Sequence, residues 1–127
     1  LRDMAACSTD IHFEGSQPPL SWYQKAKVFL MASPREGWGL TITESLQNGV
    51  VPIVLNTSKV FKDIISDASN GFLPNTEKEY TERLESLLSD NSKCRRIAIE
   101  GLKSAHRFTP EIVGEKWQSL LNKLQNK

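Results

Sequence analysis

Cysteine is scarce in this sequence, and its positions form no metal-binding or redox pattern. Cys7 and Cys94 are the two cysteines among 127 residues, and neither belongs to a C-x-x-C or a paired Cys/His spacing. Structural zinc sites and thioredoxin-like chemistry require such spacings, so the sequence supports neither class. Two separate thiols fit a reducing compartment, and we expect the protein to be cytoplasmic.

Long apolar runs and an excess of one charge are also missing. No apolar run approaches the roughly 18 residues that a membrane-spanning helix needs. The formal net charge is +1, so no overall field would attract nucleic acid or a membrane. The first residue is Leu1, and no basic-then-apolar signal pattern follows it, so we expect part of a longer protein. The length of 127 residues suits one domain.

Apolar segments and turn signals alternate along residues 1–75. We expect a helix tail over residues 1–7, strands over 10–14, 26–32, 50–55 and 72–73, and helices over 22–25, 40–48 and 58–66. Ser21 is placed to cap the first of these helices, and Gly49 to end the second. Strands alternating with helices predict a Rossmann-like α/β fold of three layers, in which a parallel sheet has helices on both faces.

Residues 76–127 have a different pattern, which predicts a helical tail to the same single domain. Three apolar stripes at helical spacing lie over residues 80–88, 97–105 and 113–124. Thr109 followed by Pro110 matches an N-cap with proline at the first helical position. The last stripe contains Trp117, and its simplest interpretation is core packing.

The loop over residues 33–39 lies where ligands bind in open α/β sheets, at the carboxyl end of a strand. Gly37 and Gly39 flank Trp38, and glycine lets the backbone turn or approach a ligand closely. The free N–H groups at the start of the next helix, residues 40–43, form a natural site for an anion such as a diphosphate.

Two glutamates bracket this loop and the start of the helix. Glu36 and Glu44 are carboxylates that could accept hydrogen bonds from sugar hydroxyls, including both hydroxyls of a ribose diol. Each has a structural alternative. Thr41 and Glu44 match a capping box, with Thr41 as N-cap, and Glu36 taken alone is a solvated loop acid.

The segment SPREGWGLTITESLQNGVVPIV, residues 33–54, resembles the E-x7-E region of the retaining family 4 glycosyltransferases, which have the GT-B fold. The resemblance continues through Asp63-Ile-Ile and Asn70-Gly-Phe-Leu, covering residues 26–75. It implies that the chain is the C-terminal, nucleotide-sugar-binding half of a two-domain enzyme. The implied reaction transfers a hexosyl-type sugar to an acceptor with retention at the anomeric carbon. Such enzymes generally need no metal or other cofactor.

By the same resemblance, Glu36 would lie beside the donor sugar and the reacting centre as the catalytic residue. The backbone of Gly37, Trp38, Gly39, Leu40 and Thr41 would approach the diphosphate, and Glu44 would bind the ribose. The expected partners are a nucleotide sugar and a glycan, lipid or small-molecule acceptor. Nucleic acid is not expected, and the full protein could lie peripherally on the inner membrane face.

Two departures from the family pattern affect these expectations. Where the family commonly has a Gly-Gly turn and a glutamate, this sequence has Ser58-Lys59 and Asp63. The family's phosphate-neutralising basic residues lie upstream of Leu1, and Arg35 is on the wrong side of the motif to replace them. We therefore expect the chain alone to bind donor weakly and to be inactive.

Other interpretations remain open. Trp38 could stack on a sugar or pack under the loop, and packing is favoured because aromatic rings bury a large area. His12 and His106 are interpreted as structural or solvated. The stripe over residues 113–124 could dock onto another domain, as GT-B terminal helices often do. The same fold also serves sugar-nucleotide epimerases, phosphorylases and non-catalytic binding modules.

Overall fold

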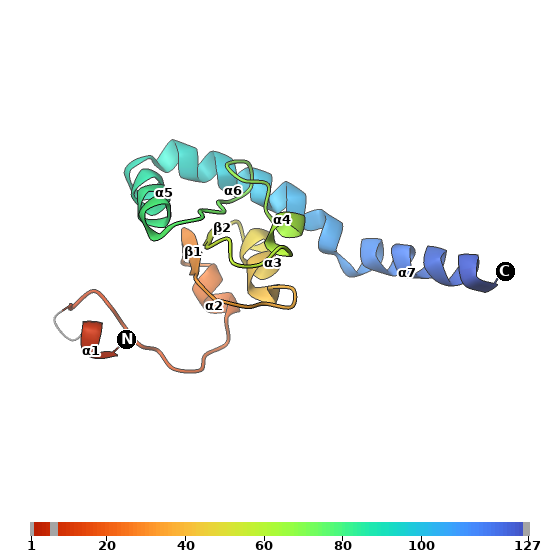
Figure 1. The fold of residues 1–127 in the computed structure, drawn as a ribbon, viewed down its shortest axis with the longest axis horizontal. Coiled ribbons are helices and arrows are strands. Elements are labelled where there is room, and N and C mark those ends of the chain that lie inside the picture. Colours follow the sequence, from red (N-terminus) through yellow and green to blue (C-terminus); the bar gives the residue numbers. More distant parts are fainter. Residues whose placement is uncertain (1, 6–7, 126–127) are drawn as a thin grey trace.

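The computed structural model describes residues 2–5 and 8–125 (Figure 1). Its elements, in chain order, are α1 (Arg2–Ala5), α2 (Leu20–Tyr23), β1 (Val28–Met31), α3 (Leu40–Gln47), β2 (Val51–Val54), α4 (Phe61–Ile64), α5 (Glu77–Ser89), α6 (Asn91–Ala105), the 3-10 turn η1 (His106–Phe108) and α7 (Pro110–Gln125). Within the described part of the chain, no helix combines the length and apolarity needed to cross a bilayer.

The sheet is parallel, as the sequence predicts. β1 and β2 run side by side in register, with Val28 opposite Val51 and Met31 opposite Val54. Ile53 forms a further parallel bridge with Phe72, which is all that remains of the strand expected over residues 72–73. All four residues of β2 are buried, because apolar side chains pack against both of its faces.

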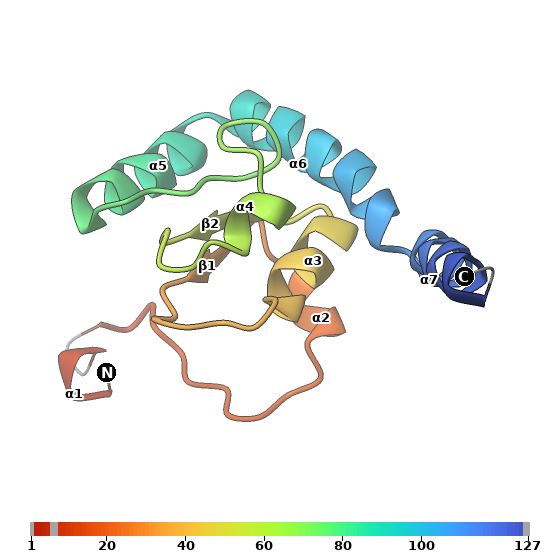
Figure 2. The same cartoon turned by 45° about the vertical axis from the view of Figure 1, so that its right-hand side comes forward.

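Helices cover both faces of the sheet. One apolar cluster joins β1 and β2 to α3 and α4, with Ile42, Leu46 and Phe61 fully buried in it. A second cluster joins the opposite face to α5 and α6, through Leu87 and Ile97. Figure 2 shows α5 and α6 above the two strands and α3 beside them, on the right. The predicted three-layer α/β arrangement is therefore confirmed.

α3 ends where the sequence predicts. Gly49 has φ +68°, and its N–H donates to Leu46 O at 3.1 Å, while Val50 N–H donates to Ser45 O at 2.9 Å. These two bonds form a Schellman motif, in which a left-handed glycine closes the helix. The motif turns the chain directly into β2 and so fixes α3 against the sheet.

Several local predictions are wrong in detail. Residues 10–14 are exposed and form no strand, because no neighbouring strand in the described segments supplies ladder hydrogen bonds. α2 begins at Leu20 after Pro19, and Ser21 does not cap it, since its Oγ donates to Pro18 O at 3.4 Å. The helix expected over residues 58–66 is shortened to α4. The first expected helix tail is seen as α1, and Cys7 lies outside the described residues.

α7 confirms the predicted helix but not the predicted packing. It begins at Pro110, and Val113 N–H donates to Thr109 O at 3.0 Å in its first turn. No residue of α7 is buried, and Trp117 is 61% exposed. Figure 1 shows α7 projecting away from the body of the molecule. Core packing within this chain is thus the wrong interpretation of its stripe.

Candidate functional site

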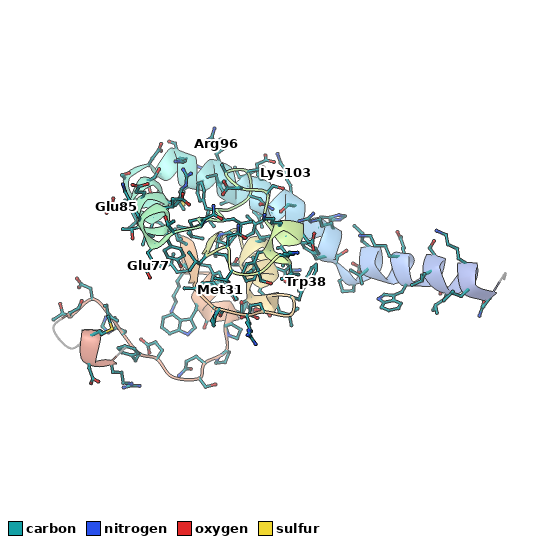
Figure 3. All side chains as sticks on the ribbon, viewed as in Figure 1. Met31, Trp38, Glu77, Glu85, Arg96 and Lys103 are labelled. Atoms are coloured by element: carbon teal, nitrogen blue, oxygen red, sulfur yellow. The ribbon has the colours of Figure 1, made fainter. Side chains whose placement is uncertain are left out.

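The site begins at the loop that joins β1 to α3. Met31, at the end of β1, accepts a hydrogen bond from Leu55 N–H at 2.9 Å, and Thr57 Oγ1 donates to Ser33 O at 2.7 Å. These contacts tie the start of the loop to the segment after β2. Met31 and Trp38, labelled in Figure 3, mark where the loop leaves the strand and where it nears α3.

Gly37 and Gly39 have different structural roles. Gly39 is the N-cap of α3, in the left-handed region at φ +89° and ψ +58°. A Cβ there would lie 2.8 Å from Ile42 Cδ1 and 3.7 Å from Phe61 Cε1, so this position favours glycine on conformational and packing grounds. Gly37 is exposed and a Cβ there would meet no atom within 4 Å. Nothing in the folded chain itself requires glycine at Gly37.

The start of α3 presents backbone donors to solvent. Ile42 and Thr43 N–H donate to Gly39 O at 2.9 and 3.4 Å. Within residues 2–5 and 8–125, no oxygen accepts a hydrogen bond from the N–H of Leu40 or Thr41, and both residues are exposed. Free N–H groups at a helix start, together with the helix dipole, favour an anion.

The capping-box alternative for Glu44 is wrong. Gly39 occupies the N-cap position, and Thr41 already lies inside the helix. Glu44 is therefore a residue of the second helical turn, too far along to cap the first. Its side chain is partly buried, and its Oε2 accepts a hydrogen bond from the Tyr23 hydroxyl at 3.2 Å.

Tyr23 is a site residue that the sequence did not single out. It lies in α2, 21 residues before Glu44, and its hydroxyl is also 3.2 Å from Thr41 O. Burial raises the pKa of Tyr23 to about 12, and the negative charge and hydrogen bond of Glu44 add to the effect. The short helix over residues 22–25 was predictable, but no local signal pairs it with α3.

The Glu36 end of the loop is less constrained. The Glu36 side chain is partly buried, and it makes no hydrogen bond or ion pair with any residue that the structure describes. Trp38 is 38% exposed, and its ring meets the edge of Phe108 with 5.6 Å between centroids and 79° between planes. One part of the indole therefore packs on η1 while another faces solvent.

The segment that departs from the family pattern forms right-handed turns. Phe61 N–H donates to Ser58 O at 3.3 Å and Lys62 N–H to Lys59 O at 3.2 Å. Neither Ser58 nor Lys59 has a positive φ, so this segment does not need the conformation that favours glycine. Asp63 is exposed in α4.

A cavity of about 390 Å³ adjoins the site on the side of α2. Its lining is mainly apolar and includes Trp22, Tyr23 and Phe29, together with residues of the segment before α2. None of residues 36–44 lines it, so it touches the motif through Tyr23 alone.

Neither a cluster of metal-ligand side chains nor a buried histidine lies in the described part of the chain. Within the described residues, no three His, Cys, Asp or Glu side chains gather as they would around a metal ion. His12 is exposed. His106 is also exposed, at the end of α6, where its backbone N–H donates to Lys103 O.

Residues 5–104 match the family described as glycosyl transferases group 1. The chain belongs to this family. This group 1 chain is 29% identical over 113 residues to the UDP-N-acetylglucosamine–peptide N-acetylglucosaminyltransferase GtfA subunit of Limosilactobacillus reuteri, covering 82% of the chain and 22% of that relative. It spans between 16% and 30% of the length of such curated relatives.

Solved structures of glycosyltransferases share the fold of this group 1 domain. The pneumococcal O-GlcNAc transferase GtfA, in complex with UDP and GlcNAc, matches 99% of the chain and 27% of its own, with a TM-score of 0.83 and 22% identity. The C-terminal domain of a group 1 protein (LpcC) from Francisella tularensis matches 83% of the chain and 56% of its own, at TM-score 0.68 and 26% identity. The expected GT-B type of α/β domain is thereby confirmed.

Proposed function

We propose that this chain binds a nucleotide-sugar donor and supplies the donor half of a retaining, metal-independent glycosyltransferase site. The backbone from Gly37 to Thr41 would receive the diphosphate, Glu44 would bind the ribose hydroxyls, and Glu36 would lie beside the transferred sugar. The acceptor would bind to another part of the full protein, and the chain alone would have no transferase activity. Under the same proposal, the full protein is a member of glycosyltransferase family 4.

One observation carries this proposal. The start of α3 combines N–H groups of Leu40 and Thr41 that have no acceptor in the described chain with the Glu44 carboxylate one turn further on. A diphosphate suits the first group and a ribose diol suits the second, and a nucleotide offers the two in sequence. Glu44 has no cationic partner among the described residues that would make it a structural ion pair.

The relatives support the same class of ligand. The GtfA structure is described as holding UDP and GlcNAc, and the Limosilactobacillus relative is named for a UDP-linked sugar. The matching Francisella structure is a C-terminal domain, which supports assigning this chain to the same half of its enzyme.

The test measures nucleotide binding to the chain by calorimetry or NMR. UDP, GDP and ADP are titrated, each beside its 2′-deoxy counterpart, which lacks one of the ribose hydroxyls. At least one ribonucleotide should bind, and more tightly than its deoxy form. Glu44→Gln should weaken ribonucleotide binding about tenfold to a hundredfold and remove most of the preference for ribose.

Two results would contradict the proposal. If none of the three nucleotides binds at millimolar concentration, the chain holds no donor site. If Glu44→Gln leaves both the affinity and the ribose preference unchanged, Glu44 is not the ribose ligand. Glu85→Gln changes an exposed carboxylate in α5, away from the motif, and is the matched control that should leave both quantities unchanged.

A further inference from the structure

The Tyr23 hydroxyl joins α2 to α3 at the carboxylate that we assign to ribose. We propose that Tyr23 is a positioning residue, which fixes the Glu44 carboxylate in the orientation that receives the ribose hydroxyls. The inference rests on the proposed function of Glu44. It adds a second residue, from a different element, to the nucleotide site.

The Tyr23 side chain is itself well anchored. Its exposed fraction is 8%, and its ring packs in a T-shaped arrangement with Phe29 in β1, with 6.2 Å between centroids. Its backbone N–H donates to Pro19 O at 3.0 Å, and its C=O accepts from Ala26 N–H at 3.3 Å. Burial of the ring, its packing on Phe29 and the two backbone hydrogen bonds limit the movement of the hydroxyl, so the hydroxyl is a fixed reference point for α3.

Glu44 depends on this contact for its orientation. Within residues 2–5 and 8–125, the Tyr23 hydroxyl is the one side-chain or backbone group that donates a hydrogen bond to the Glu44 carboxylate. The bond uses Oε2, and no donor among the described residues reaches Oε1. A glutamate side chain loses substantial rotamer freedom when it is fixed, and a bond made before the ligand arrives removes part of that cost from binding.

The hydroxyl also keeps the proton that it must donate. Burial, with the charge and hydrogen bond of Glu44, raises the pKa of Tyr23 to about 12, so the phenol stays protonated across the neutral range. Thr41 O, in the backbone of α3, is also 3.2 Å from the hydroxyl, so the one phenolic proton is shared between this carbonyl and the Glu44 carboxylate. One phenol therefore contacts both the ribose end of α3 and the turn whose N–H groups face the diphosphate.

The test compares Tyr23→Phe with wild type, using the nucleotide and 2′-deoxynucleotide pair that binds wild type most tightly. Phenylalanine keeps the ring and its packing on Phe29 but removes the hydroxyl. We expect ribonucleotide affinity to fall about threefold to tenfold, and deoxynucleotide affinity to fall less, so that the preference for ribose shrinks. Ser89→Ala removes an exposed hydroxyl from α5, on the opposite face of the sheet, and is the control that should change neither affinity.

A double-mutant cycle separates this inference from the function on which it rests. In a Glu44→Gln background, Tyr23→Phe should cause little further loss of ribonucleotide affinity. The reason is that Tyr23 acts through the Glu44 carboxylate, which this background already lacks. Equal losses for the two nucleotides, or full additivity with Glu44→Gln, would make Tyr23 merely structural and overturn the inference. An unchanged affinity in Tyr23→Phe would overturn it too. If Glu44→Gln itself has no effect, the proposed function fails instead.

Discussion

The two ends of residues 36–44 are built differently. At the Glu44 end, α3 is fixed by buried Ile42 and Leu46, closed by the Schellman motif at Gly49, and joined to α2 through Tyr23. At the Glu36 end, the carboxylate makes no contact by hydrogen bond or charge within the described chain. The loop there is held chiefly through Thr57 and the ring of Trp38.

This difference suggests which part of the site the domain forms by itself. A preorganised group binds without first losing conformational freedom, so under the proposed function the Glu44 end would bind a nucleotide with little rearrangement. The Glu36 end has its backbone in place but its carboxylate without a partner. We infer that the nucleotide is recognised by this domain alone, whereas the sugar end is completed only when the donor binds.

The largest expected effect comes from exchanging the two carboxylates for amides. Glu36→Gln should leave binding of the preferred nucleoside diphosphate within about twofold of wild type, because the side chain has no structural contact to lose. In the full-length protein it should lower turnover about a hundredfold or more, since under the proposed function it removes a charge beside the reacting centre. Glu44→Gln should instead weaken nucleotide binding, as measured by calorimetry.

Loss of turnover in one variant and loss of nucleotide affinity in the other would establish that the two ends have separate roles. Equal loss of nucleotide affinity in the two variants would show that residues 36–44 act as one unit. Full turnover in Glu36→Gln would remove Glu36 from the catalytic machinery.

The next effect concerns the two glycines between these ends. Gly39→Ala should lower the free energy of unfolding by about 1–3 kcal/mol, because alanine is strained at φ +89° and its Cβ would press on Ile42. Gly37→Ala should change it by less than about 0.5 kcal/mol, since the position is open. Urea denaturation measures both. A stable Gly39→Ala variant would mean that α3 can start in another conformation.

Local sequence signals were sufficient for the elements that carry the site. The apolar runs at residues 26–32 and 50–55 predicted the two parallel strands, and Gly49 predicted the end of α3. Such signals work because each reports a requirement of one segment: burial on both faces, or a left-handed residue after a helix. The start of α3 was also correct, although the N-cap is Gly39 and not Thr41.

What the sequence did not predict depends on which segments meet. Ile97 in α6 and Trp117 in α7 belong to similar apolar stripes, yet Ile97 is 1% exposed and Trp117 is 61% exposed. Periodicity identifies the apolar face of a helix but not its partner. The Tyr23–Glu44 contact joins residues 21 apart, and the segment over residues 10–14 alternates without a strand beside it. No local pattern encodes either fact.

A pH titration examines the Glu44 end without any ligand. The pKa of Tyr23 is raised from 10.0 to about 12 in the folded state, so folding favours the protonated phenol. Its contribution to stability is fully present below pH 10 and is lost as the pH rises through 12. The melting temperature, measured from pH 9 to 12, should therefore fall less steeply with pH for Tyr23→Phe than for wild type. Parallel declines would mean that burial and the Glu44 charge do not raise the pKa of the Tyr23 phenol in the folded state.

The smallest effect is expected at the tether of the Glu36 end. Thr57→Val removes the hydroxyl that donates to Ser33 O at 2.7 Å, and Thr57→Ser keeps it. Because Thr57 is exposed, the valine variant should lose only about 0.5 kcal/mol of stability in urea denaturation. Its affinity for the preferred nucleotide should not change, since the Glu44 end is fixed independently. Its affinity for the corresponding nucleotide sugar should fall about twofold, because the loop that carries Glu36 is less well held. If the valine variant weakened nucleotide and nucleotide sugar equally, the two ends would share one scaffold, and the domain could not recognise the nucleotide separately from the sugar.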